Sequence, residues 1–125
     1  MISYILVSMG AAIGGALRFG ISGYIQRNSA VIFPYGTLFV NVAGTFILGL
    51  IMFYLNEKEL IGNEMRLFLT VGFCGGFTTF STFSYETLML FRDSEFGLAV
   101  FNVFLNVALC LFGIYMAYII SKLIG

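Results

Sequence analysis

The chain has 125 residues, of which 60% are hydrophobic and only 10% are charged, and its mean hydropathy is +1.01. Since a soluble domain carries about 25% charged residues, this composition excludes a soluble globular protein and indicates an integral membrane protein. The six Lys/Arg and six Asp/Glu cancel, and there is no His, which argues against nucleic-acid binding and against His-based catalysis or metal ligation.

The positions of the charges predict four membrane-spanning helices. Eight charges fall in two short clusters, which are Glu57, Lys58, Glu59, Glu64 and Arg66, then Arg92, Asp93 and Glu95. A spanning helix needs about 20 apolar residues, and the uncharged stretches accommodate helices at about 3–25, 34–55, 67–91 and 96–121. The runs are continuous rather than alternating, which excludes a β-barrel. We therefore expect one all-α, four-helix transmembrane domain over residues 1–125.

The first two predicted helices contain small residues and two polar candidates. Gly10 and Gly14, with small neighbours on adjacent turns, let helix backbones approach closely. Arg18 lies inside the first span, where an ionisable group is a functional candidate unless it extends to the membrane surface. The second helix begins near Pro34 and carries Asn41, whose amide can donate to an anion or join two helices.

The third predicted helix is expected to be broken near the middle of the membrane. Gly72, Gly75 and Gly76 lie within five residues and precede alternating hydroxyl and phenyl side chains, a poor composition for a continuous helix. Backbone interrupted at this depth lines a cavity or is buried in protein, and its free N–H and C=O groups can hold ions. The alternative is a glycine-rich packing site whose hydroxyls bond back to the helix.

After the glycines, Phe80 and Phe83 share one helix face. Phenyl edges are positive and attract an anion weakly, although two rings at this spacing are also typical of a core. In the fourth helix, Asn102 and Asn106 are four residues apart, with Cys110 a turn further. Their amides can serve an ion pathway or link helices, and Cys74 and Cys110 are expected to be packing thiols.

The distribution of positive charge gives little preference for one orientation. Arg27 and Arg92 lie on the side of the first and third loops, against Lys58, Arg66 and Lys122 on the side of the termini. Lys and Arg normally fix orientation, so we expect the chain to insert both ways and to pair with an inverted copy, unless a single residue decides the orientation. Four helices around one axis enclose no useful pathway, so a transport role implies an oligomer.

Three segments together resemble the Fluc/CrcB family of fluoride channels: Gly14–Phe19, Gly36–Gly44 and Gly72–Phe83. The resemblance covers essentially the whole chain. It implies an antiparallel, dual-topology homodimer in the lipid of the inner (plasma) membrane. Such a dimer exports fluoride passively and lowers its toxicity.

The resemblance also implies residue roles. Phe80 and Phe83 would meet fluoride with their ring edges, and the carbonyls of Gly75 and Thr78 from both subunits would hold a structural Na⁺. The remaining residues that the resemblance assigns to the fluoride pathway are Asn41, Ser81, Thr82, Glu86, Asn106 and Arg18.

Two other functions are alternatives. A small proton-coupled multidrug exporter also has four helices, but its mechanism needs a carboxylate within the membrane. The first helix has none, and Glu86 lies near a helix end. The second alternative is a passive scaffold subunit, but this role would leave the alternation of hydroxyl and phenyl side chains in the third helix unexplained. The chain contains no catalytic Ser/His/Asp or Cys/His set, so an enzyme is not expected.

Overall fold

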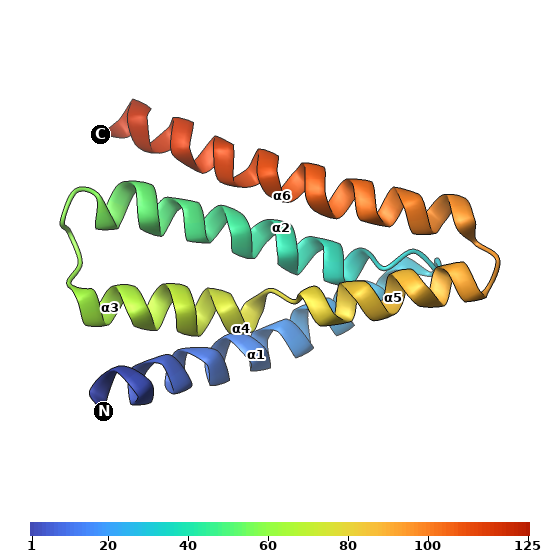
Figure 1. The fold of residues 1–125 in the computed structure, drawn as a ribbon, viewed down its shortest axis with the longest axis horizontal. Coiled ribbons are helices and arrows are strands. Elements are labelled where there is room, and N and C mark those ends of the chain that lie inside the picture. Colours follow the sequence, from blue (N-terminus) through green and yellow to red (C-terminus); the bar gives the residue numbers. More distant parts are fainter.

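The computed structural model describes all 125 residues, and every element in it is helical (Figure 1). The elements in chain order are α1 (Ile2–Ser29), α2 (Tyr35–Leu50), η1 (Ile51–Asn56), α3 (Asn63–Leu67), η2 (Phe68–Cys74), α4 (Gly75–Phe77), α5 (Phe80–Arg92) and α6 (Phe96–Ile124). The segments η1 and η2 are π-helical continuations of α2 and α3. Such segments are rare and are frequently found at functional sites.

The prediction of four apolar spans is confirmed. Four helical stretches are long and apolar enough to cross a membrane: Ile2–Ser29, Tyr35–Asn56, Asn63–Arg92 and Phe96–Ile124. Three of them extend several residues beyond the predicted bounds. The third begins at Asn63 rather than 67, because Glu64 lies in the first turn of α3, where the helix dipole favours an acidic side chain.

The helices form an antiparallel bundle in which α2 lies between α6 and the stretch from α3 to α4, and α1 crosses η2 and α4 (Figure 1). Both termini lie at one end, together with the loop at 57–62, and the loops at 30–34 and 93–95 lie at the other end. An even number of spans requires this arrangement.

Glycines make a close backbone contact between α1 and the third span. Gly10 and Gly14 of α1 face the backbone of η2 and α4. From the other side, a Cβ added at Gly76 would lie 2.5 Å from the carbonyl oxygen of Ala11. Real Cβ atoms do not approach backbone this closely, so neither helix accepts a larger residue here. Small residues of α1 therefore serve packing within one chain.

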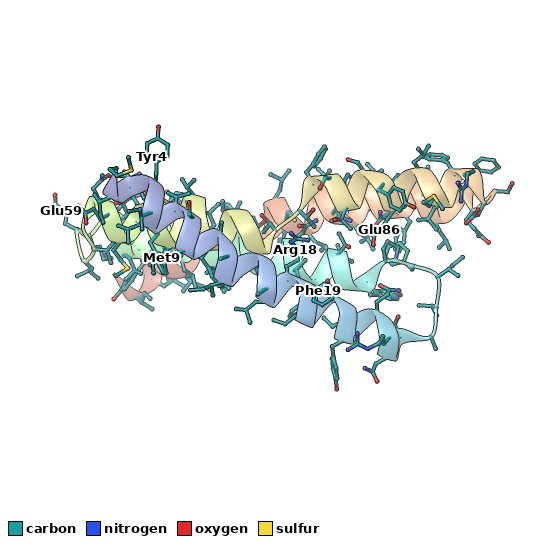
Figure 2. All side chains as sticks on the ribbon, turned by 90° about the horizontal axis from the view of Figure 1, so that it is seen from below. Tyr4, Met9, Arg18, Phe19, Glu59 and Glu86 are labelled. Carbon is teal, nitrogen blue, oxygen red and sulfur yellow. The ribbon has the colours of Figure 1, made fainter.

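The outer surface is strongly apolar. Only 25 of the 125 residues are buried, and exposed large side chains include Tyr4, Phe19 and Phe104. Tyr4 projects away from the bundle in Figure 2. An apolar surface of this extent suits lipid or a second membrane subunit rather than water.

Candidate functional site

The backbone between α4 and α5 is not helical. Thr78 (φ −91°, ψ 162°) and Thr79 (φ −152°, ψ 120°) are both extended, between a helix that ends at Phe77 and one that begins at Phe80. Thr79 caps α5, because its Oγ1 accepts a hydrogen bond from the Thr82 N–H at 3.1 Å. A threonine in this position replaces one of the hydrogen bonds that a helix start lacks.

Asn41 of α2 holds the extended segment through two hydrogen bonds and makes a third to α6. Its Oδ1 accepts from the Thr79 N–H at 2.7 Å, and its Nδ2 donates to the Thr79 carbonyl at 3.1 Å. The second Nδ2 hydrogen goes to Oδ1 of Asn106 in α6 at 3.0 Å. Both amide hydrogens therefore have protein acceptors, and the side chain supplies hydrogen bonds that a continuous helix would have supplied itself.

This arrangement removes the usual donors from the two carbonyls assigned to Na⁺ by resemblance. The N–H of Thr79, which would bond to the Gly75 carbonyl in a continuous helix, donates to Asn41 instead. The N–H of Thr82, which would bond to the Thr78 carbonyl, donates to the Thr79 hydroxyl. The freed oxygens are of the kind that hard cations prefer. No group of three or more His, Cys, Asp or Glu is placed to hold a metal.

Arg18 lies beside the same segment (Figure 2). Its Nε donates to the Gly76 carbonyl at 2.9 Å, so a side chain from α1 satisfies one of the last carbonyls of α4. Arg18 makes no salt bridge, since the chain's one ion pair joins Arg92 and Asp93. The guanidinium charge therefore remains uncompensated close to the interruption.

A cavity of about 250 Å³ opens next to the extended segment. Its lining includes five residues that were predicted as site residues and four others; the nine are Asn41, Thr78, Phe80, Phe83 and Asn106, with Thr45, Thr79, Val107 and Cys110. The rings of Phe80 and Phe83 are 5.4 Å apart between centroids and are inclined at 47°. Phe83 is 8% exposed, whereas Phe80 is 79% exposed.

From the cavity wall a chain of buried hydrogen bonds, here called the amide relay, runs through Asn41, Asn106, Asn102 and Thr87. Nδ2 of Asn106 donates to Oδ1 of Asn102 at 3.0 Å, and Nδ2 of Asn102 donates to Oγ1 of Thr87 at 2.9 Å. The two Asn of α6 thus link α2 to α5. The sequence indicated polar positions at Asn102 and Asn106 but gave no sign of Thr87 as their partner.

The other predicted residues lie outside the cavity. Ser81 and Thr82 surround the Thr79 hydroxyl at 3.3 and 3.1 Å. Glu86 lies further along α5 (Figure 2), next to a second cavity of about 270 Å³ shared with Gln26 and Asp93. One oxygen of the Glu86 carboxylate is buried and has no hydrogen-bond partner.

Of the four cavity residues that were not predicted as site residues, Thr79 and Cys110 carry groups that matter to the site. Thr79 provides the cap and both backbone groups held by Asn41, and its signal in the sequence was a threonine immediately before a helical segment, a residue type typical of an N-cap. Cys110 lines the cavity as a free thiol, and Cys74 is a buried free thiol.

Comparison with known proteins gives consistent matches along the chain. The family described as "CrcB-like protein, Camphor Resistance (CrcB)" matches residues 5–118. A relative from Paramagnetospirillum magneticum is 42% identical, with 100% of this chain and 99% of the relative covered, and one from Geobacter sulfurreducens is 43% identical, with 98% of each covered. A third, from Thermus thermophilus, is 45% identical over 92% of this chain and 91% of its own length. Each relative bears the name "Fluoride-specific ion channel FluC".

Proposed function

Because the chain belongs to the CrcB family, we propose that it is a fluoride-specific ion channel whose conduction path passes the cavity beside Thr78 and Thr79. The observation that carries this proposal is the identity of 42–43% to fluoride channels over almost the full length of both chains. Family membership favours the channel over the multidrug exporter. The channel carries out transport and no catalysis.

The cavity provides what a small, strongly hydrated anion needs. Conduction requires binding that compensates lost water but still releases the ion. The cavity contains hydroxyls, amides and phenyl rings but no Lys or Arg, so ring edges add modest attraction without a fixed counter-charge. The N-terminus of α5 points its positive dipole end to the same region. Since both Asn41 amide hydrogens have acceptors, an anion gains a bond from Asn41 only by replacing one of them.

The functional unit is proposed to be an antiparallel, dual-topology homodimer, with the interruption between α4 and α5 at mid-membrane depth. The exposure of Phe80 supports this, because a ring that meets an ion must be covered from lipid by another surface. The near-equal Lys/Arg counts on the two sides support insertion in both orientations. Reporter fusions to either terminus should then appear on both sides of the membrane, and a single orientation in every cell would contradict the topology.

A structural Na⁺ is proposed at the carbonyls of Gly75 and Thr78, both freed from helical hydrogen bonding. Two carbonyls from each subunit would supply four oxygen ligands. When bound, the cation would offset the partial negative charge of these carbonyls and join the two chains. Arg18 keeps the neighbouring Gly76 carbonyl out of this set by donating to it.

In the cell, the proposed site of action is the inner (plasma) membrane, where the channel lets fluoride leave down its gradient and so lowers toxicity. The test is efflux from liposomes that contain the purified protein, measured with a fluoride electrode and repeated with chloride. We expect rapid fluoride efflux and little chloride efflux. Equal rates for the two anions, or no fluoride efflux from well-assembled protein, would contradict the proposal.

A further inference from the structure

The amide relay has one direction, set by the backbone. The Thr79 N–H can only donate, so Asn41 must present its Oδ1 to it, at 2.7 Å. The Asn41 amide nitrogen then faces Oδ1 of Asn106, and the Asn106 nitrogen faces Oδ1 of Asn102, each at 3.0 Å. Each amide orientation is fixed by the one before it.

The relay ends on the backbone of α5. Oγ1 of Thr87 accepts from Asn102 at 2.9 Å and donates its own hydrogen to the Phe83 carbonyl at 2.7 Å. The relay therefore starts at the N–H of the residue before Phe80 and returns at the carbonyl of Phe83. The two ends of the relay thus lie on either side of the turn of α5 that carries both rings.

Burial makes the last link of the relay important. Asn102 is 1% exposed and Thr87 is 9% exposed, so neither can replace a lost partner with water. Their bond is the only side-chain hydrogen bond between α5 and α6, and the rings of Phe91 and Phe96 make an apolar contact between the same helices. Apolar contacts permit rotation of a helix more readily than a directional hydrogen bond does.

We propose that Asn102 and Thr87 are positioning residues for the ion pathway. Their hydrogen bond fixes the rotation of α5 against α6, and through it the orientation of the Phe80 and Phe83 ring edges at the cavity. This inference rests on the proposed fluoride channel function, but the rotation of α5 itself can be measured without fluoride.

The chain offers a closely matched control. Thr70 is 8% exposed and donates its hydroxyl to the Arg66 carbonyl four residues earlier at 2.7 Å, as Thr87 does to Phe83. Its hydroxyl accepts from no other side chain. Thr87→Val and Thr70→Val therefore remove the same local bond, and only the first also breaks the relay. Thr87→Ser retains the hydroxyl. Asn102→Leu breaks the link to Thr87 from α6 and also removes the Oδ1 that accepts from Asn106.

The full-length protein in liposomes is the sample for fluoride efflux. Thr87→Val and Asn102→Leu should lower efflux at least about tenfold with the oligomer intact, since an ångström of misplacement suffices for such losses at positioned sites. Thr87→Ser and Thr70→Val should stay within about threefold of the unmodified protein. Fluoride efflux by the double variant Thr87→Val/Asn102→Leu should be no lower than that of Asn102→Leu alone, because Asn102→Leu already breaks the bond that Thr87→Val removes.

The second readout is the rate at which a small thiol reagent labels Cys110, which lines the cavity, in a Cys74→Ala background. A rotated α5 should change this rate for Thr87→Val and Asn102→Leu but not for Thr70→Val. Equal effects of the two valine variants on efflux and labelling, or a loss in Thr87→Ser as large as in Thr87→Val, would overturn the inference. If the unmodified protein conducts no fluoride, the proposed function fails. The labelling rates alone then show whether the Asn102–Thr87 bond fixes the rotation of α5.

Discussion

Replacing Phe80 or Phe83 with isoleucine separates a role in conduction from a role in packing. Isoleucine keeps the apolar character and much of the volume of phenylalanine but has no aromatic quadrupole. The two rings form one pair at 5.4 Å, yet their burial differs greatly, with Phe80 79% and Phe83 8% exposed. A pathway role and a core role therefore predict different results for the two substitutions.

The expected magnitudes follow from that difference. Phe80→Ile changes an exposed side chain and should alter the free energy of unfolding by no more than about 0.5 kcal/mol. Phe83→Ile loses a buried ring and its aromatic partner, which costs about 1 kcal/mol. If each ring edge stabilises the conducting ion by about 1.4 kcal/mol, either substitution lowers fluoride flux about tenfold.

The assay is electrode-monitored fluoride efflux, with size-exclusion chromatography for assembly and tyrosine fluorescence for unfolding, since the chain has no Trp. Phe91→Ile is the matched control, because Phe91 also lies on α5 and forms a similar tilted pair with Phe96 (6.1 Å, 49°), but away from the cavity. Normal flux in Phe80→Ile, with a loss in Phe83→Ile that follows its lower stability, would refute a role of the ring edges in conduction.

Three further outcomes are expected. Gly76→Ala should destabilise the chain by about 1–3 kcal/mol in thermal unfolding, because its Cβ would lie 2.5 Å from a backbone oxygen of α1, whereas Gly20→Ala, with nothing within 4 Å, should not. Ala30 ends α1 at a φ of 54°, so Ala30→Gly should raise stability by up to about 1 kcal/mol and Ala30→Val should lower it. Replacing Na⁺ with a large organic cation over long incubation should reduce flux and dimer stability; unchanged values of both would argue against the Na⁺ site.

Much of the fold could be predicted because burial in lipid depends on composition. Four uncharged stretches predicted four helices. The helices end near the charged residues, because these side chains must reach water. The π-helical segments η1 and η2 were not predicted, because a bond to the fifth rather than the fourth residue leaves no mark in apolar composition. The glycines and hydroxyls of the third span did indicate irregular backbone, and Thr78 and Thr79 are extended.

The candidate site was less predictable than the fold. The sequence indicated that Asn41 is polar and within a span, but its partner Thr79 is 38 residues away. Which groups meet depends on how each helix is rotated, and apolar helices carry little information about rotation. For the same reason the sequence could not show that Glu86, which the resemblance assigns to the pathway, lies next to a cavity other than the one beside Thr79.

The position of both termini at one end of the bundle (Figure 1) constrains how two copies can be joined in one gene. In the proposed antiparallel dimer, the C-terminus of one subunit and the N-terminus of the other face opposite compartments. A short flexible linker therefore holds tandem copies parallel, which is the wrong arrangement. A single-chain version of this dimer needs a linker that itself crosses the membrane, such as an added apolar helix of about 20 residues.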